Sequence, residues 1–393
     1  MIADKEITAP VSHTGTVNNS ENQNNYIDNS KIQNSQNDYN ISDDVCTDVI
    51  FGQEDVEPIT RINKEILKNF QPKKKHTIPL SESYQRLGYI DKSARVKDCG
   101  TFLEFQRPVN SSTCKLSYAN FCRDRLCPVC SWRRSLKIFG QVSKIMDHIQ
   151  DDFEFIFLTL TVPNVTASEL PSKINQMQKA FTTMAHDNKR FNGAVCGYFK
   201  ALEVTHNKNR YSKSFDTYHP HFHNILAVDK RYYKSKDYIK QSEWLDMWRK
   251  YMKDDSITQV DVRRCTSKDK SECEKSEKAL SSAVAEVAKY ATKSSDYIIP
   301  WSDELTDNSV NALLSALSGR RLCSFGGVFD LVRKALKFDD AEDGDLLHVE
   351  ADKIRADVAL QIYRYAWSCG AYKLTAVERK VNPLVEISDD ENF

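Results

Sequence analysis

The sequence predicts an α+β fold, with a central antiparallel sheet flanked by helices, an N-terminal zinc-binding module and a helical C-terminal part. Three observations lead to this prediction. Runs of β-branched and aromatic residues alternate with helical patterns, a polar and turn-rich link lets two of these runs pair antiparallel, and several cysteines cluster in one segment before them.

Three segments have the composition of strands. Residues Phe153–Val162 form a β-branched and aromatic run that ends at the turn signal Pro163-Asn164. Gly197–Val204 and His221–Val228 are two more such runs. The polar link His206–Thr217 joins them, which favours antiparallel pairing.

Helical patterns separate and follow these strands. Apolar residues spaced by four and three predict a helix with one buried stripe, at Leu170, Ile174, Met177, Phe181 and Met184. Similar patterns predict helices at Ser242–Met252, Lys278–Lys293 and Lys353–Trp367.

Composition and patterning divide the chain into five parts. We expect a disordered polar and acidic leader, a cysteine-rich zinc module, the central sheet domain, a helical region and an acidic tail. Their bounds are 1–75, 76–145, 146–300, 301–385 and 386–393. No run of about eighteen apolar residues or secretory leader occurs, so we expect a cytoplasmic protein without a membrane partner.

The formal net charge of zero conceals a segregation of charge. Residues 1–57 hold 2 Lys or Arg against 11 Asp or Glu, residues 58–338 hold 47 against 31, and the rest hold 6 against 13. The net charges are therefore −9, +16 and −7. A basic middle is typical of a protein that binds nucleic acid, although surface charge without a function is the alternative interpretation.

The segment His219-Pro220-His221-Phe222-His223 lies inside a predicted strand. Because strand side chains alternate, His221 and His223 project to the same face, where two imidazoles can bind a metal ion. Glu203 is a carboxylate among apolar residues on the expected partner strand and is the candidate third ligand. A hydrogen-bonded histidine pair without a metal is the alternative, and His219 is a further candidate ligand or supporting residue.

A second cluster is expected on the helix predicted at Lys278–Lys293. Glu286, Tyr290 and Lys293 stand at i, i+4 and i+7, so that an acid, a phenol and an ammonium share one helix face. A cation that polarises a phosphate would make the phenol an effective nucleophile. A surface Glu/Lys pair around a half-buried tyrosine is the plainer interpretation.

The third cluster consists of cysteines. Cys122 and a Cys127-Pro128-Val129-Cys130 knuckle need one more thiolate for a tetrahedral structural zinc site. We prefer Cys99 as this ligand, because the glycine that follows it relieves a tight turn; Cys114 is the rival. Buried free cysteines are the alternative. Trp132, Arg133 and Arg134 follow at once, which predicts DNA contacts through stacking and phosphate binding.

The order of these motifs resembles that of the HUH endonucleases, and in detail that of the rolling-circle replication initiators of small plasmids from Gram-positive bacteria. The resemblance is carried by Phe157–Asn164, the histidine motif, Tyr290-x-x-Lys293, Phe121–Arg134 and Arg320–Gly327. It spans roughly Cys99 to Asp345.

This resemblance implies a site-specific DNA-nicking endonuclease and nucleotidyltransferase that uses Mn²⁺ or Mg²⁺. Tyr290 would form a 5′-phosphotyrosine bond and leave a 3′-OH primer, Lys293 would hold phosphate oxygens, and Glu286 would activate water to terminate replication. Tyr297 is a rival nucleophile beyond the expected end of the helix. The third metal ligand is less fixed in the family than the two histidines, so Glu203 is the weakest of the three.

The expected partners are plasmid origin DNA, single-stranded or as a hairpin, and the host replication machinery. Because the sequence has no P-loop, a host helicase would unwind the duplex. A homodimer is left open. The alternative functions are an HUH transposase, a zinc-dependent DNA-binding regulator without catalysis, and a zinc hydrolase acting on a small substrate.

Overall fold

The computed structural model describes residues 67–108, 114–265, 284, 288, 293–348 and 360–380. All of them belong to one compact unit, Phe51–Phe393. Within this described part, the fold is α+β with antiparallel sheets flanked by helices, as the sequence predicts. No described helix has the length and apolar character needed to cross a membrane.

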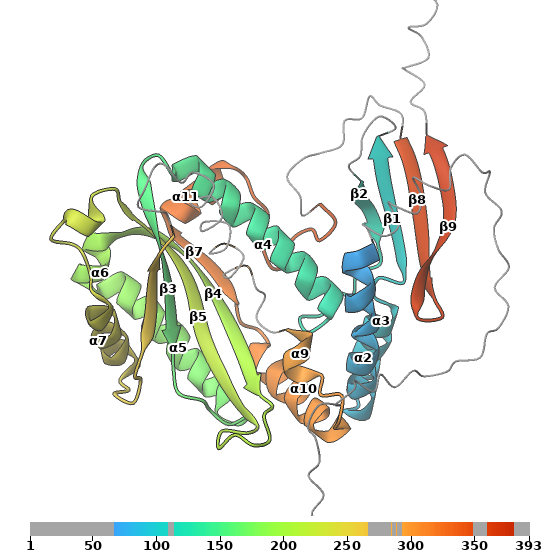
Figure 1. Ribbon diagram of the computed structural model, residues 1–393, viewed down its shortest axis with the longest axis horizontal. Helices are drawn as coiled ribbons and strands as arrows, with labels where there is room; N and C mark the ends of the chain where they lie inside the picture. The colour runs from blue at the N-terminus through green and yellow to red at the C-terminus, as the bar shows by residue number, and fades with distance from the viewer. Residues whose placement is uncertain are drawn as a thin grey trace, which may run out of the picture. The chain divides into compact units, whose positions relative to one another are not determined.

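The larger of the two described sheets is antiparallel, has five strands and has the strand order β6-β3-β5-β4-β7 (Figure 1). Its strands are β3 (Phe153–Thr161), β4 (Val195–Asn207), β5 (Thr217–Asp229), β6 (Val260–Arg264) and β7 (Cys323–Gly327). The three strands predicted from composition are confirmed, and β4 and β5 are longer than predicted because their pairing continues through the polar ends.

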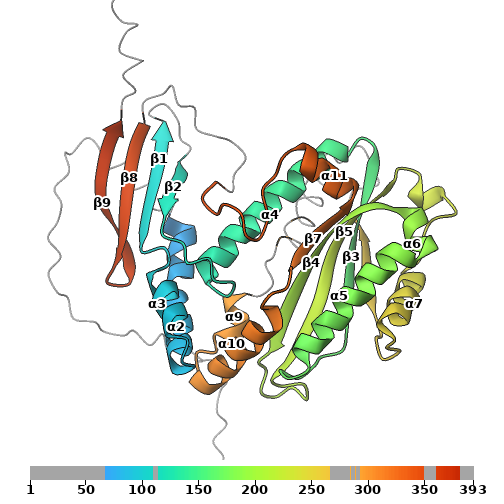
Figure 2. The same cartoon turned by 180° about the vertical axis from the view of Figure 1, so that it is seen from behind.

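Two of the predicted helices cover one face of this sheet. They are α5 (Leu170–Asp187), which crosses the face nearest the viewer in Figure 2, and α7 (Gln241–Met252). Phe181 of α5 and Trp248 of α7 both contact Phe222, with ring centres 5.9 and 6.3 Å away. Residues with even numbers on β5 therefore form a dry core, and those with odd numbers face the other side. Short helix α6 (Lys189–Ala194) connects α5 to β4.

The opposite face carries α11 (Val328–Ala335), where Phe329 contacts Phe155 of β3 at 6.3 Å between ring centres. Two further helices come between β6 and β7 in the chain, namely α9 (Ser294–Tyr297) and α10 (Asp303–Leu317). His206 at the end of β4 ties both to the sheet, since its Nδ1 lies 3.0 Å from the Asp296 carbonyl oxygen and 3.2 Å from Ser309 Oγ.

A second, four-stranded antiparallel sheet joins distant parts of the chain in the order β2-β1-β8-β9. It consists of β1 (Phe102–Pro108), β2 (Lys115–Ala119), β8 (Leu360–Ser368) and β9 (Ala371–Lys380). The two C-terminal strands thus complete the sheet that begins in the cysteine-rich segment. The predicted domain boundaries at residues 145 and 301 therefore separate strands that belong to one sheet.

The prediction of a helical region over 301–385 is wrong in part. Helices α10 and α11 are present, but Leu360–Ser368 is a strand and not the end of a helix at Lys353–Trp367. Ile362, Tyr363 and Tyr365 are buried there. β-branched and aromatic residues favour a pleated, half-buried strand, and pairing with β1 on one side and β9 on the other overrides the helical spacing.

The folded part begins before residue 76, so the predicted leader over 1–75 is too long. Residues 67–75 are helical and lead into α2 (Thr77–Arg86) and α3 (Ile90–Asp98). Phe70 is buried between Phe105 and Trp132, with ring centres 5.8 and 4.8 Å away. The rest of the predicted leader and the tail over 386–393 lie outside the described residues.

Helix α4 (Pro128–Ile149) begins at the cysteine knuckle and reaches the five-stranded sheet domain. An acidic loop, residues 339–347, binds along it. Lys137 Nζ lies 2.5 Å from an Asp339 carboxylate oxygen, and Gln141 donates to the Asp339 carbonyl oxygen at 3.1 Å. These bonds fix the loop that follows α11 against α4.

Gly327 provides a test of the contact between β4 and β7. Its φ is +56°, and an added Cβ would collide with the carbonyl oxygen of Cys196 and the backbone of Gly197. We expect Gly327→Ala to lower the free energy of unfolding by about 3 kcal/mol, from backbone strain plus this collision. Gly319→Ala is the control, since its φ of +66° carries the strain but nothing lies within 4 Å. Urea unfolding that gives equal losses for both variants would contradict the close approach.

Lys200 gives a second test, of the packing between α5 and the sheet. Its ammonium lies 4.7 and 4.5 Å from the ring centres of Phe181 and Phe222 and donates to Gln178 Oε1 at 2.6 Å. Burial lowers the pKa of Lys200 from its ordinary value of 10.5 to about 8. The unfolded chain therefore binds more protons between these pH values, so the stability of the folded protein must rise as pH increases through this window.

We expect the stability of the wild type relative to Lys200→Met to increase by about 2 kcal/mol from pH 7.5 to pH 9.5. Urea unfolding at the two pH values measures this change. Lys179→Met, which replaces an exposed lysine of the same helix α5, is the control and should show no such change. A pH-independent difference for Lys200→Met would mean that the lysine is hydrated in the folded state.

Candidate functional site

Glu203, His221 and His223 meet on one face of the central sheet. The antiparallel register pairs Glu203 of β4 with His221 of β5, and His223 follows two residues later on the same face. One ligand atom from each side chain lies within 4.8 Å of the other two. All three residues are buried, so this face of the sheet holds a compact group of metal-ligating atoms.

Hydrogen bonds orient the two imidazoles. His221 Nδ1 lies 3.1 Å from the carbonyl oxygen of His219, and His223 Nδ1 lies 3.4 Å from Thr159 Oγ1 of β3. Their Nε2 atoms both point to Glu203 Oε2, at 3.3 and 2.9 Å. A ring nitrogen bound to a carbonyl or hydroxyl while the other faces a carboxylate is typical of histidines that hold a metal. This donor set fits a divalent cation.

The Glu203 carboxylate is ionised in this setting. Burial by itself raises its pKa, but the hydrogen bonds and charges of His221 and His223 outweigh burial and hold the pKa well below its ordinary value. A buried anion between two imidazoles requires cationic partners, and either protonated rings or a metal ion supplies the charge.

Lys293 reaches the same carboxylate from the segment before α9. Its Nζ lies 3.4 Å from Glu203 Oε1, while about half of its side chain is exposed. The backbone of Lys293 is extended and the residue caps α9, so the prediction that it is part of a helix through residue 293 is wrong. The side chain nevertheless reaches the group formed by Glu203, His221 and His223, because the segment approaches the end of β4.

Tyr290 and Glu286 lie outside the described residues. Two neighbours are described, Val284 and Ala288, both buried and joined by a 2.9 Å backbone hydrogen bond of helical spacing. Tyr297, the rival nucleophile, is fully buried in α9 and its phenol donates to the carbonyl oxygen of Leu126. Burial raises the pKa of Tyr297 well above its ordinary value, and the phenol lies against the cysteine segment. This environment does not suit a nucleophile.

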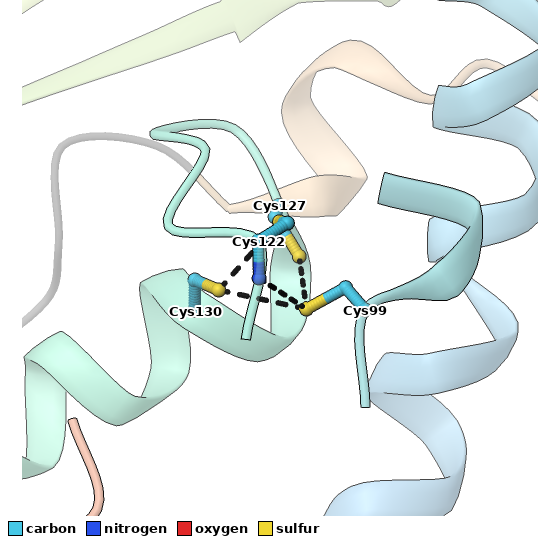
Figure 3. Close-up of side chains that lie close together, drawn as sticks. All are labelled: Cys99, Cys122, Cys127 and Cys130. Atoms are coloured by element: carbon cyan, nitrogen blue, oxygen red, sulfur yellow. Dashed lines mark hydrogen bonds between the residues drawn. The ribbon is translucent and has the colours of Figure 1, made fainter. Parts of the chain in front are cut away.

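A second group of ligand atoms is formed by Cys99, Cys122, Cys127 and Cys130, all buried (Figure 3). Cys99 follows α3, Cys122 lies in the loop after β2, and Cys127 and Cys130 start α4. Three sulfur–sulfur distances are 3.5, 3.6 and 3.7 Å. Tetrahedral coordination with bonds of about 2.3 Å places sulfurs about 3.8 Å apart, so the cluster fits a four-coordinate metal.

Backbone amides surround these sulfurs. The amides of Cys122, Arg123 and Asp124 donate to sulfurs at 3.3 to 3.4 Å. Such donors stabilise thiolates, which a buried cluster without a cation would protonate. Gly100 has φ +67°, the turn expected after Cys99. Cys114 is absent from the group, and burial raises the pKa of its thiol to about 12.

The prediction that Arg133 and Arg134 contact DNA conflicts with their positions. Both side chains are buried and bind the acidic loop. Arg133 donates to the carbonyl oxygens of Leu346 and Leu347 at 2.9 and 2.8 Å, and Arg134 donates to that of Glu342 at 2.9 Å. Trp132 is half-buried and packs on Phe70, with Lys73 above its ring at 4.5 Å. The three residues thus support the packing of α4.

Sequence patterns missed several residues that shape the site. The sequence predicts His206 as the start of a polar link, yet it is buried, stacks on Tyr218 with ring centres 4.6 Å apart and pairs with Asp216 at 2.9 Å. Thr159 belongs to a strand motif that was noted, but its contact with His223 depends on the register between β3 and β5. Only the pairing of distant segments reveals these roles.

Comparison with known proteins identifies the class. Residues 113–373 match the replication protein family, so the chain belongs to this family, and its relatives agree with the rolling-circle initiators that its motifs resemble. It is 36% identical over 322 residues to a protein named "Protein rep" from Bacillus amyloliquefaciens, across 77% of this chain and 92% of the relative.

Further relatives have the same name. A Staphylococcus aureus "Protein rep" is 40% identical over 213 residues, or 53% of this chain and 86% of the relative. One from Lentilactobacillus hilgardii is 32% identical over 316 residues, or 79% and 95%. No solved structure matches the chain.

We predict that the metal content of the protein depends on the four thiols of the cysteine cluster. We expect Cys127→Ser to release the metal held by the cluster and to destabilise the protein by several kcal/mol, because coordination couples directly to folding. Cys114→Ser is the control and should keep both metal and stability. Metal analysis by mass spectrometry and thermal unfolding measure the two effects, and unchanged metal content in Cys127→Ser would exclude the four-sulfur site.

Proposed function

We propose that this chain is a plasmid rolling-circle initiator that nicks one strand of origin DNA and joins Tyr290 to the 5′ phosphate. Family membership supports the replication role. The observation that carries the chemistry is the contact between Lys293 and Glu203, 3.4 Å, beside the two histidines. Tyr290 is three residues from Lys293, and three residues span at most about 11 Å, so the phenol is tethered near the metal-ligating group.

His221, His223 and Glu203 would hold one Mn²⁺ or Mg²⁺ ion. When bound, this cation would draw charge from the oxygens of the scissile phosphate. The bond-making and bond-breaking steps use the chain's own tyrosine. The Tyr290 oxygen attacks phosphorus and loses its proton, a P–O bond to tyrosine forms, and the P–O3′ bond breaks. The departing O3′ takes up a proton and becomes the primer hydroxyl.

Lys293 would move its ammonium from Glu203 to a phosphate oxygen when DNA enters. The half-exposed side chain leaves room for this movement. An ammonium at that position neutralises charge that develops as the phosphorus is attacked. Because the phosphotyrosine bond retains the energy of the cleaved ester, a 3′-OH can later reverse the attack and reseal the strand.

Termination would use Glu286 in place of a second tyrosine. As a general base it would remove a proton from water, so that water breaks a phosphodiester that is not resealed. We also propose that the four cysteines bind a structural zinc ion, since four thiolates in tetrahedral geometry are typical of closed zinc sites.

The partners that complete this function are proposals as well. Origin DNA would be bound as a single strand or a hairpin, a host helicase would unwind the duplex, and the host replication machinery would extend the 3′-OH. Such work would place the protein in the cytoplasm.

Tyr290→Phe tests the chemistry directly. With a labelled single-stranded origin oligonucleotide and Mn²⁺, we expect the wild type to give a cleaved product and a covalent protein–DNA adduct. Tyr290→Phe should form neither, with a rate at least about a thousandfold lower, while its affinity for the oligonucleotide stays the same. Denaturing gels and mass spectrometry of the adduct measure the outcome.

Matched variants sharpen this test. Tyr297→Phe also removes one phenol, but from a buried hydrogen bond, and should keep adduct formation. Glu286→Gln should form the adduct and fail to release the protein after one round. An adduct that persists in Tyr290→Phe and disappears in Tyr297→Phe would overturn the assignment. A wild-type protein that binds the oligonucleotide but does not cleave it would favour a DNA-binding regulator without catalysis.

A further inference from the structure

A cavity of about 500 Å³ lies between α3, the loop after Cys122 and the C-terminal end of α10. It shares no residue with the Glu203, His221 and His223 group. The side chains that matter for its chemistry are those of Tyr89, Lys92, Arg95, Arg123, Asp124 and Arg125. The volume is in the range of small-molecule sites and suits a single nucleotide.

The charge of the cavity favours an anion. Four basic residues line it against one carboxylate, Asp124, which is buried and already accepts from the Tyr84 phenol and the Leu126 amide, each at 2.9 Å. Lys92 also contacts this carboxylate, at 3.2 Å. The formal basic excess of the lining is therefore three charges, although Arg125 also pairs with the buried Glu342 carboxylate, 3.8 Å away. Such an excess attracts a polyanion.

Arg95 and Arg123 carry the part of this charge that is least neutralised. Their guanidinium groups donate to backbone carbonyl oxygens, of Cys122 and Asp343 respectively. Among the residues that the structure describes, no carboxylate forms an ion pair with either group. A carbonyl oxygen leaves the net charge in place, and a guanidinium keeps further N–H groups for a phosphate.

Arg125 closes the end of the cavity at α10. It donates to the carbonyl oxygens of Leu317, 3.0 Å away, and Arg320. The Leu317 carbonyl is at the negative end of the α10 dipole, so Arg125 offsets a field that would repel an anion.

Tyr89 adds an aromatic surface to this basic lining. It is 39% exposed. The ring meets Tyr84 edge to face, with centres 6.2 Å apart, and the phenol lies 3.4 Å from Asn311 Oδ1 of α10. A fixed, exposed aromatic ring beside several cations is typical of sites that stack a nucleobase and bind its phosphates.

The cysteine cluster sets the shape of this lining. The amide of Arg123 donates to Cys130 Sγ at 3.3 Å, and the backbone of Arg123 has φ +59°. The carbonyl that accepts from Arg95 belongs to Cys122, another member of the cluster. The geometry of the sulfurs thus fixes where two guanidinium groups stand.

We propose that this cavity binds one unpaired nucleotide of the origin strand, with the base on Tyr89 and the phosphate between Arg95 and Arg123. The choice of origin DNA as the source rests on the proposed function. Binding itself needs neither the tyrosine chemistry nor the metal at Glu203. The cavity anchors the strand at a second point, which holds it in register for cleavage elsewhere.

Fluorescence anisotropy of the full chain tests the proposal, with a labelled single-stranded origin oligonucleotide and no added divalent cation. We expect Tyr89→Ala to raise Kd about tenfold and Tyr89→Phe, which keeps the ring, to leave it unchanged. Arg95→Gln should weaken binding and reduce the steepness of the log Kd against log salt plot by about 0.7. Lys97→Ala is the control, since this exposed lysine of α3 does not line the cavity.

Several outcomes would overturn the proposal. One is a Kd within twofold of wild type for both Tyr89→Ala and Arg95→Gln, when circular dichroism and metal content show that they are folded. In another, Tyr89→Ala weakens the binding of a deoxynucleoside monophosphate, while the Kd for the oligonucleotide is unchanged by both substitutions. The ligand of the cavity would then be a free nucleotide.

The result is separable from the proposed nicking reaction. If the wild-type protein forms no adduct but Tyr89→Ala still weakens oligonucleotide binding, the nicking reaction is contradicted and the cavity proposal is supported. If Tyr89→Ala forms the adduct at the wild-type rate and binds the oligonucleotide with wild-type affinity, the cavity proposal fails and the nicking reaction is supported.

Discussion

The antiparallel register between β4 and β5 is the constraint on which the candidate site depends. It sets Glu203 opposite His221, and strand alternation then brings His223 to the same carboxylate. A slip by one residue would turn both imidazoles into the core beneath α5 and α7. Each strand is thirteen residues long, the pairing runs from Val195 with Val228 to Asn207 with Thr217, and Phe222 is fully buried on the reverse face. Hydrophobic packing on one face therefore holds the polar group on the other in place.

Much of this site could be predicted from sequence because its information is local. Alternation along one strand fixes the relation of His221 to His223, and a carboxylate between apolar neighbours marks Glu203. The Cys99 sulfur lies with the other three and that of Cys114 does not, since a glycine after Cys99 allows the turn that places its sulfur. The role of Cys99 as a zinc ligand stays a prediction. The nucleophile assigned to Tyr290 stays a prediction.

The failures share one physical cause, which is a partner far away in the sequence. Arg133 and Arg134 follow a cysteine knuckle as DNA-binding residues often do, yet carbonyl groups some 200 positions later bind them. The helical spacing before Trp367 is outweighed by pairing with β1, more than 250 residues earlier. Lys74 falls within the predicted leader over 1–75, but it is buried and donates to the Lys97 carbonyl oxygen.

The union of β1 with β8 has a consequence for synthesis of the chain. Until the ribosome releases the last strands, β1 has an open edge, while the sulfur ligands beside it are already complete. Unpaired strand edges invite association with other chains, so the nascent protein is exposed to aggregation over most of its translation. A premature stop codon near the end of the gene would then leave this sheet with an unprotected edge, a product suited to removal by proteases and not to replication.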